Sequence, residues 1–155
     1  MMNRAEDAKF MRAALELAKE AAADGEVPVG AVIVKNGEII AVGRNRREID
    51  RQALAHAELE AIRAACETLG GWRLFDCTLY VTLEPCPMCA GAIINARIDR
   101  VVYGAPDPKA GSCGSITDLF ALPYNHQPIT ESGVLEEECA AVLKDFFRAL
   151  RKNKS

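Results

Sequence analysis

Two short motifs in this sequence bring together residue types that bind metal ions. An H-A-E motif supplies His56 and Glu58, and a P-C-P-M-C motif about thirty residues further on supplies Cys86 and Cys89. Structural zinc sites are usually closed by four protein ligands, whereas catalytic sites leave one position for water. Three ligands with a carboxylate nearby therefore predict a hydrolytic zinc site, in which the metal lowers the pKa of water and Glu58 transfers protons.

A closed structural zinc site is the alternative interpretation of the same residues. Its fourth ligand would come from the other cysteines or the second histidine, namely Cys66, Cys77, Cys113 or His126. The sequence contains one C-x-x-C motif and no second one to pair with it. The absence of a second pair favours the catalytic interpretation.

The spacing of the motifs indicates how the chain positions them. Thiols at i and i+3 lie on one face of a helical turn, and prolines suit the first turn of a helix. The positive end of the helix dipole favours the thiolate form that binds metals. His56 and Glu58 are two residues apart and do not share a helix face. We therefore expect a helix to begin at this motif, with the glutamate reaching back over the ion.

Length and composition are those of one ordinary globular domain. The chain has 155 residues, of which 50 % are hydrophobic and 26 % charged, and its net charge is −3. No stretch approaches the ~20 apolar residues of a membrane span, and the N-terminus lacks a signal-peptide pattern. The cysteines outside the motif lie among apolar residues, which predicts free thiols in a reducing cytoplasm rather than disulfides; they are Cys66, Cys77, Cys113 and Cys139.

Hydrophobic periodicity predicts helices and strands in alternation. Helices are expected over about 5–23, 55–69, 86–96 and 135–150, with a short apolar helix near 116–122. Strands are expected over 31–34, 38–42, 79–83, 100–103 and 129–132, and Asn36-Gly37 predicts a hairpin between the first two. The last helix is amphipathic, with one apolar side formed by Leu135, Cys139, Val142, Phe146 and Leu150. This alternation predicts an α/β fold in which helices cover a mixed sheet, with the site at helix N-termini along one sheet edge.

The sequence resembles the tRNA-specific adenosine deaminases of the bacterial TadA type, within the cytidine deaminase superfamily. The zinc motif identifies the superfamily, and blocks along nearly the whole chain carry the narrower resemblance: 26–31, 55–58, 78–86, 88–92, 100–105, Asp118, Asn125-His126 and 146–148. The resemblance implies a three-layer α/β/α fold with a mixed five-stranded sheet, formed by residues 1–155 as a single zinc-dependent deaminase domain. It also implies a homodimer, supported only by the apolar segment 90–94, which is equally compatible with a core position.

The resemblance further implies the reaction. The enzyme would hydrolyse adenosine to inosine at the wobble position (34) of the anticodon stem-loop of tRNA-Arg, releasing ammonia. His56, Cys86 and Cys89 would hold one Zn²⁺ per subunit, with water in the fourth position. Glu58 would take the proton of that water, deliver a proton to N1 of adenine and protonate the departing amine.

The substrate contacts implied by the resemblance each have a simpler structural alternative. Asn45 would hydrogen-bond the flipped base, or serve as a turn residue. Apolar walls around the base would be formed by Pro28, Val29 and Leu83, with Ala57 beside them; all are compatible with plain core packing. Asp107 and Lys109 would lie beside the nucleotide, or be solvated turn residues. Asn125 and His126 would lie near the RNA, or support neighbouring residues or a helix cap.

The C-terminal segment is basic. It carries Lys144, Arg148, Arg151, Lys152 and Lys154 against one acid, Asp145. Cations at a helix C-terminus complement the helix dipole, and the same cations, Arg151 among them, would contact RNA phosphates. Phe147 falls outside the apolar side of the helix and would stack on an exposed base.

Two other functions use the same motifs. A deaminase of a free base or nucleoside, guanine or cytosine, would use the same zinc chemistry. A zinc-stapled RNA-binding module without catalysis is the third possibility, but such a module does not need Glu58 beside the metal. The loop after the fourth expected strand contains Pro106 and Pro108, which would stiffen it and influence the choice of substrate.

Overall fold

A mixed five-stranded sheet forms the centre of the computed structural model, which describes residues 4–153. Its strand order is β2-β1-β3-β4-β5; β1 is antiparallel to β2 and β3, whereas β4 is parallel to β3 and β5. The strand bounds are β1 Gly30–Lys35, β2 Glu38–Arg44, β3 Cys77–Leu83, β4 Arg100–Ala105 and β5 Ile129–Ser132. The predicted mixed five-stranded sheet is confirmed.

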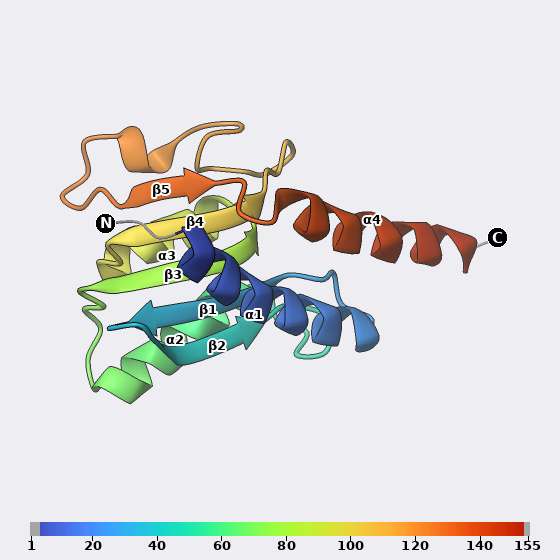
Figure 1. Cartoon of the computed structure of the whole chain (residues 1–155), viewed down its shortest axis with the longest axis horizontal. Coiled ribbons are helices and arrows are strands. Elements are labelled where there is room, and N and C mark those ends of the chain that lie inside the picture. Colours follow the sequence, from blue (N-terminus) through green and yellow to red (C-terminus); the bar gives the residue numbers. More distant parts are fainter. Residues whose placement is uncertain (1–3, 154–155) are drawn as a thin grey trace.

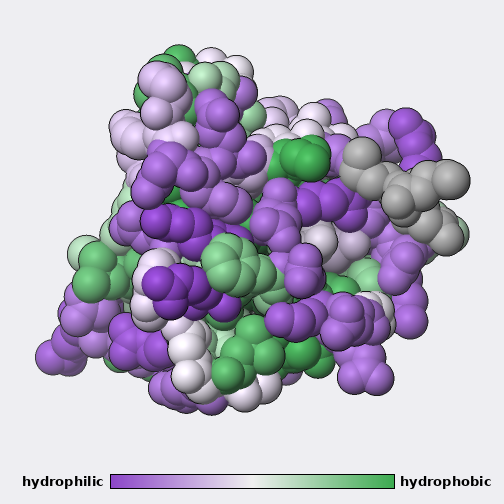
Figure 2. All heavy atoms as spheres, turned by 90° about the vertical axis from the view of Figure 1, so that its left-hand side faces the viewer, coloured by the Kyte–Doolittle hydropathy of each residue, from purple (hydrophilic) through white to green (hydrophobic). Residues whose placement is uncertain are grey.

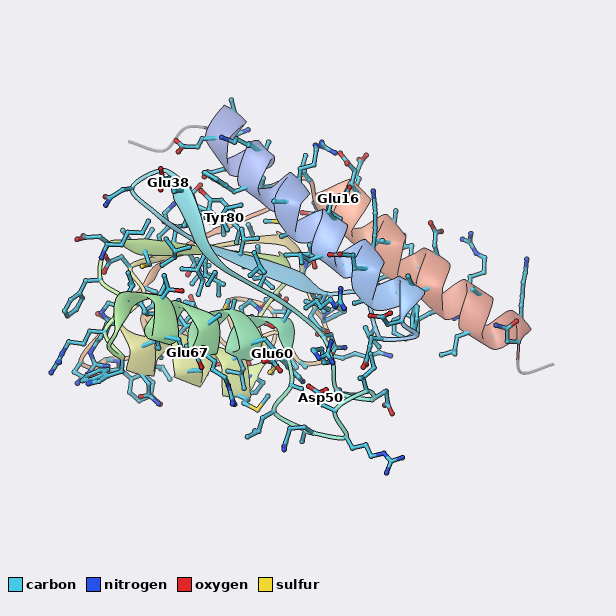
Figure 3. The ribbon with its side chains drawn as sticks, turned by 90° about the horizontal axis from the view of Figure 1, so that it is seen from below. Glu16, Glu38, Asp50, Glu60, Glu67 and Tyr80 are labelled. Atoms are coloured by element: carbon cyan, nitrogen blue, oxygen red, sulfur yellow. The ribbon has the colours of Figure 1, made fainter. Side chains whose placement is uncertain are left out.

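Helices cover both faces of this sheet. Helices α1 and α4 lie together on one face, and α2 and α3 lie on the other (Figures 1 and 3). Their bounds are α1 Arg4–Ala23, α2 Ala57–Leu69, α3 Pro87–Ala96 and α4 Glu136–Lys152. The α/β/α layering is therefore also as predicted. Within residues 4–153, no helix has the length and apolar character of a membrane span.

The alternation of side chains along the strands supplies a separate core to each helical layer. Val32, Tyr80 and Val102 pack against α1 and α4, together with Phe10 and Met11 of α1. The neighbouring strand residues point to the other face, where they pack against α2 and α3: Ala31, Ile33, Leu79, Val81, Val101 and Tyr103. This period of two is the expected pattern for strands buried on both faces.

Close backbone contacts fix two helices against the sheet. A Cβ atom on Gly43 of β2 would lie 2.3 Å from the carbonyl oxygen of Ala57, and one on Gly30 of β1 would lie 2.0 Å from that of Ala14. Only glycine permits so close an approach. Because Ala57 is the first residue of α2, Gly43 sets the position at which this helix begins, beside His56.

The hairpin prediction is confirmed in its details. Asn36 and Gly37 have φ values of 52° and 77°, so both adopt the left-handed conformation that a tight turn between twisted strands requires. The turn joins β1 to β2 and thereby fixes the direction of β2.

The carboxyl ends of β2, β3 and β4 lie at the same edge of the sheet because these strands run in one direction. The segments that follow them carry the candidate site residues, and α4 leaves the sheet at the same edge (Figure 1). Figure 2 shows the opposite end of the molecule, where apolar side chains lie in small groups among hydrophilic ones. The edge with the carboxyl ends is the common position for ligand sites in such sheets.

Two elements differ from the sequence prediction. The expected helix near 116–122 is a single 3₁₀ turn, Leu119–Ala121, because the preceding residues hydrogen-bond the 106–115 loop and Pro123 prevents continuation. In α4, only Cys139 of the predicted apolar side is buried, and Leu150 is exposed. The distal half of α4 extends beyond the sheet, so no described element covers it (Figure 1). Lys154 lies outside the described residues.

The four cysteines outside the metal motif are free thiols, as predicted. Cys77, Cys113 and Cys139 are buried, and Cys66 is half-buried on α2. Burial raises the pKa of the Cys139 thiol to about 12, which keeps it protonated and unreactive.

A buried ion pair attaches the start of α1 to the sheet. The Asp7 carboxylate, 2 % exposed, accepts hydrogen bonds from the Tyr80 hydroxyl and from Arg100 Nη2, both at 2.6 Å. Arg100 Nη2 also lies 3.1 Å from a Glu131 carboxylate oxygen. Burial by itself raises the pKa of Asp7, but the hydrogen bonds from Arg100 and Tyr80 outweigh burial and hold the pKa below its usual value.

We expect Asp7→Asn to lower the free energy of unfolding by about 3 kcal/mol, because Arg100 would keep a buried charge without its main partner. The folded pKa of Asp7 is below the unfolded value near 4. The contribution of Asp7 to the free energy of unfolding is therefore complete above about pH 4 and is lost as the pH falls through the lower folded pKa. Urea unfolding of both proteins across this range should show a difference that shrinks on acidification. Glu16→Gln, in an exposed pair with Lys19, should cost less than about 1 kcal/mol. If the difference in unfolding free energy between wild type and Asp7→Asn did not change with pH, the role assigned to the Asp7 carboxylate would be wrong.

Candidate active site

The H-A-E motif occupies the start of α2. His56 is the N-cap residue, with extended backbone at φ −81° and ψ 152°, and Glu58 is the second helical residue. This change of backbone conformation between them allows both side chains to face one cavity although they are two residues apart. The Glu58 carboxyl interacts with the Cys89 thiol, so it points toward the thiols and not away from them. The expectation that the helix begins at this motif is confirmed.

The P-C-P-M-C motif occupies the start of α3. Cys86 is the N-cap residue, Pro87 follows in the first turn, and Cys89 lies one turn on. The Sγ atoms of Cys86 and Cys89 lie 3.6 and 3.5 Å from Nδ1 of His56. Ligands bound tetrahedrally to zinc, at about 2.3 Å for sulfur and about 2.0 Å for nitrogen, are separated by about 3.5 Å. One imidazole and two thiols at this separation fit a zinc ion.

The structure brings three candidate metal ligands together. Within residues 4–153, the only group of His, Cys, Asp or Glu side chains whose ligand atoms all lie within 4.8 Å of one another is His56, Cys86 and Cys89. The residues considered as a fourth ligand do not join it; the nitrogen Nε2 of His126, for example, lies 2.7 Å from the carbonyl oxygen of Ile98. The arrangement is that of an open site, not of a closed structural one.

The charges around the candidate ligands are strongly coupled. Hydrogen bonds from Cys89 and from His56 lower the pKa of Cys86 to about 4, so this thiol ionises first. The interactions with Cys86 in turn raise the pKa of Cys89 and of His56, both of which lose a proton when they bind a metal. Burial raises the pKa of Glu58, which is 4 % exposed, to about 7. A carboxyl that titrates near neutrality can accept a proton and return it in the same reaction cycle.

A cavity of about 640 Å³ opens above these residues, a size typical of small-molecule sites. Its base is formed by His56, Glu58 and Cys86. The apolar part of its wall comes from Val27, Val29, Ala57, Leu83, Leu143 and Phe147, and the polar part from Asn45, Arg47, Asp107, Lys109 and Lys144. The structure thus brings Val29, Leu83, Ala57, Asn45, Asp107, Lys109 and Phe147 together with the metal ligands.

Asn45 has a fixed orientation in this wall. Its Nδ2 donates to the carbonyl oxygen of Val27 at 3.1 Å, and its Oδ1 accepts from the backbone N–H of Arg47 at 3.2 Å. These bonds satisfy the turn role that the sequence left open. They leave one amide hydrogen and one lone pair of Asn45 for a ligand. The two roles of Asn45 are therefore compatible.

The loop over residues 106–115 is held by a buried carboxylate. Glu84, 2 % exposed, accepts hydrogen bonds from the backbone N–H groups of Asp107, Cys113 and Ser115, each at 3.0 Å, and from the Ser115 hydroxyl at 2.5 Å. A Cβ atom on Gly111 would lie 2.4 Å from the Glu84 carboxyl carbon. Glu84 thus links the strand that leads to Cys86 with the loop that carries Asp107 and Lys109.

We expect Glu84→Gln to lower kcat/KM by about tenfold to a hundredfold, because hydrogen bonds to a charged acceptor are worth about 1.5–3 kcal/mol and an amide would face backbone donors. The loss should lie mainly in KM, with faster hydrogen exchange at Asp107, Cys113 and Ser115. Steady-state kinetics and exchange mass spectrometry would measure both. Ser115→Ala, which removes one of the four bonds, is the graded control. Loss of bound zinc with unchanged exchange in the loop would show that Glu84 acts on the metal instead.

Four residues expected at the substrate do not line the cavity. Pro28 is buried and faces away, while Val27 and Val29 on either side of it point inward. His126 bonds to Ile98 at the opposite end of the sheet, and Asn125 beside it is exposed. Arg151 is exposed near the end of α4. Any contact of Asn125, His126 or Arg151 with a substrate would lie outside this cavity.

Sequence reasoning did not assign Val27, Arg47, Glu84 and Leu143 to the site, and it treated Lys144 only as part of a basic segment. For Glu84 a signal existed, since a charged residue directly after a buried strand requires partners. The other residues reach the cavity through the packing of α4 and of the segment after β2, which no local sequence pattern indicates.

Comparison with known proteins agrees with this geometry. A model of the MafB19-like deaminase family matches residues 5–151. The tRNA-specific adenosine deaminase of Bacillus subtilis (strain 168) is 53 % identical over 150 residues, covering 96 % of this chain and 93 % of that protein.

Solved structures confirm the cytidine-deaminase-like fold. One from a study of A-to-I editing by tRNA:A34 deaminases at the wobble position of transfer RNA has a TM-score of 0.85 and 48 % identity, over 87 % of this chain and 99 % of that chain. A guanine deaminase from Nitrosomonas europaea has a TM-score of 0.76 and 27 % identity, over 90 % of this chain and 83 % of that chain. Because the family model spans nearly the whole sequence and the Bacillus protein shares more than half of it, the chain belongs to the MafB19-like deaminases and, among them, to the tRNA-specific adenosine deaminases.

Proposed function

We propose that this enzyme hydrolyses adenosine to inosine at the wobble position (34) of tRNA, with the anticodon stem-loop of tRNA-Arg as substrate and one Zn²⁺ per subunit as cofactor. The observation that carries the proposal is the open three-ligand set, with the buried Glu58 beside it, at the base of a cavity of about 640 Å³. The relatives named for tRNA adenosine deamination support the choice of substrate.

The residues of the chain divide the chemistry among them. When bound to His56, Cys86 and Cys89, zinc would lower the pKa of a water molecule toward neutrality. Glu58 accepts one proton from the attacking water and donates it to N1 of adenine; it then accepts the second proton, from the oxygen now bonded to C6, and donates it to the amine, so that the C6–N bond breaks and ammonia leaves. Its pKa of about 7 suits each of these transfers. Products are inosine and ammonia.

The walls of the cavity suit a flipped nucleobase. Val29 and Leu83 offer apolar contacts to its faces, and the free amide hydrogen and lone pair of Asn45 offer hydrogen bonds to its edge. Phe147, 40 % exposed at the mouth, is available for stacking on a neighbouring base. Flipped or unstacked bases are commonly held by such a combination of stacking and edge contacts.

Deamination of a free base, guanine or cytosine, is the second candidate function. The similarity to a guanine deaminase structure favours it, since the same zinc chemistry serves both substrates. The cationic and aromatic mouth of the cavity favours RNA, because a free base carries no phosphate and has no neighbouring base to stack on.

The test is deamination of an arginine-tRNA anticodon stem-loop with adenosine at the wobble position, with free guanine, cytosine and adenosine assayed in parallel. We expect inosine in the stem-loop and no turnover of the free compounds. Turnover of a free base with the RNA unchanged would retain the zinc mechanism and overturn the RNA substrate.

We also propose a homodimer whose interface includes the outer face of α3. This helix is apolar except for the exposed Asn95, and Gly91 and Ala92 remain only half-buried in the single chain. A Cβ atom on Gly91 would meet nothing within 4 Å, so this face has room for a partner's side chains. Sedimentation of wild type and of Gly91→Arg would test the dimer, because the arginine should dissociate it.

Residues 1–155 are proposed to act as one deaminase domain in the cytoplasm. The family match over residues 5–151 supports a single domain. The free thiols of Cys66, Cys77, Cys113 and Cys139 support a reducing compartment.

A further inference from the structure

Three cations from separate parts of the chain surround the mouth of the catalytic cavity. Arg47 lies in the segment after β2, Lys109 in the loop after β4, and Lys144 on α4. All three side chains are exposed and line the cavity wall. In a chain whose net charge is −3, their convergence at one opening is not explained by composition.

The positive charge at the mouth is not neutralised by the protein. Within residues 4–153, Arg47, Lys109 and Lys144 take part in none of the ion pairs, whereas adjacent cations do: Arg46 pairs with Asp50, and Arg148 pairs with Asp145. The acids at the cavity have other partners.

Those acids are held by hydrogen bonds or by burial. Asp107 Oδ1 accepts from the backbone N–H groups of Lys109 and Ala110. Glu84 is saturated by the 106–115 loop, and Glu58 is buried at the base. The exposed charges at the mouth are therefore those of the three cations, beside one half-buried carboxylate, Asp107.

Arg47 in particular is held in place before any ligand arrives. Its backbone N–H donates to Asn45 Oδ1, and the next two N–H groups, of Glu48 and Ile49, donate to the buried Glu26 carboxylate at 3.1 and 2.8 Å. Glu26 is only 1 % exposed. A segment fixed by three such bonds pays little backbone ordering cost when Arg47 binds a ligand.

We propose that Arg47 and Lys144, which line the cavity from the segment after β2 and from α4, form with Lys109 a clamp for the phosphodiester groups on either side of the flipped nucleotide. The guanidinium of Arg47 would bind one phosphate through two N–H donors, and the ammonium of Lys144 would bind another as a point charge. The clamp rests on the proposed RNA substrate and explains how the site selects a base within a polynucleotide. A free base or nucleoside gains nothing from it.

The test compares Arg47→Gln, Lys144→Gln and the double variant with wild type on the stem-loop substrate. Initial rates are measured between about 50 and 200 mM NaCl, where phosphate contacts change affinity steeply. Each single variant should raise KM by about threefold to tenfold with kcat unchanged. Each should also reduce the slope of log(kcat/KM) against log[NaCl] by roughly 0.7, the value for one contact to a single strand.

Lys19→Gln is the matched control, since it makes the same substitution as Lys144→Gln at an exposed lysine of α1 that pairs with Glu16 and does not line the cavity. It should leave KM and the salt slope unchanged. Arg47→Lys should restore most of the salt slope lost in Arg47→Gln, because it restores the charge. Circular dichroism would establish that the exposed substitutions leave the fold intact.

The clamp is overturned if wild type deaminates the stem-loop but the variants keep its salt slope, or if the Lys19→Gln slope falls equally. Failure of wild type to deaminate the stem-loop at any salt concentration would instead overturn the RNA substrate itself, so the two failures are distinguishable.

Discussion

Glu58→Gln is expected to lower kcat by about a thousandfold while leaving zinc content and the KM for the stem-loop nearly unchanged. Positioned acid–base groups contribute about 10²–10⁴-fold per reaction. In the proposed mechanism, Glu58 takes both protons of the attacking water in turn and delivers one to N1 and the other to the leaving amine. Glutamine has the same shape but neither accepts nor returns a proton, so it isolates proton transfer from packing. Single-turnover kinetics and metal analysis would measure the two quantities separately.

Glu60→Gln is the control, since Glu60 lies two residues on in α2, away from the catalytic cavity (Figure 3). It makes the same change of charge on the same helix and should retain nearly full activity. A Glu58→Gln variant with substantial turnover would remove Glu58 from the proton pathway. A variant that loses zinc would show that its carboxyl supports the ligands instead.

The metal ligands could be predicted from the sequence because their geometry is local. Cys86 and Cys89 lie one helical turn apart, and His56 and Glu58 meet because the chain changes from extended to helical between them. The prolines at residues 85 and 87 marked the start of α3. The contact between the two motifs is long-range. It could still be predicted, because the histidine and the two cysteines together form a metal-binding set.

The cavity wall could be predicted only in part. Val29 lies in the cavity wall as expected of it, but the sequence could not show that Val27 and not Pro28 lines the cavity, since the segment before β1 has no regular pattern to read. Arg47 and Lys144 line one cavity although they follow β2 and β5, the two edge strands of the sheet. Pairings between distant strands are not encoded in local spacing.

The short segment before Pro123 illustrates a different limit. Its apolar residues have helical spacing, yet the backbone N–H groups of Ile116 and Leu119 donate to Gly111 and Ser112 in the substrate loop. Tertiary hydrogen bonds override a weak local preference of this kind. The same bonds help to hold the loop that Glu84 anchors. The wrong prediction of a helix here therefore also missed hydrogen bonds that hold the loop beside the cavity.

Removal of the metal is expected to abolish deamination completely while leaving the chain folded. The hydrophobic core between the sheet and the layer of α2 and α3 includes Ala57 and Ala61 of α2 and Ala90 and Ile93 of α3. These contacts hold both helix starts without a metal. A chelator should therefore eliminate activity with little change in the far-ultraviolet circular dichroism spectrum, and the thermal midpoint should fall only by the stabilisation that ligand binding supplies. Added Zn²⁺ should restore activity.

Cys86→Ser should reproduce the chelated state permanently, because a hydroxyl is a poor ligand for zinc at neutral pH. Cys66→Ser is its matched control: Cys66 is a half-buried free thiol on α2 and not one of the three ligands. It should keep both metal and activity. Cooperative unfolding on chelation would indicate a metal that the fold requires, as in a closed structural site. An open site of three ligands predicts that the chain stays folded on chelation. Its fourth position, which water would occupy, serves the reaction and not the fold.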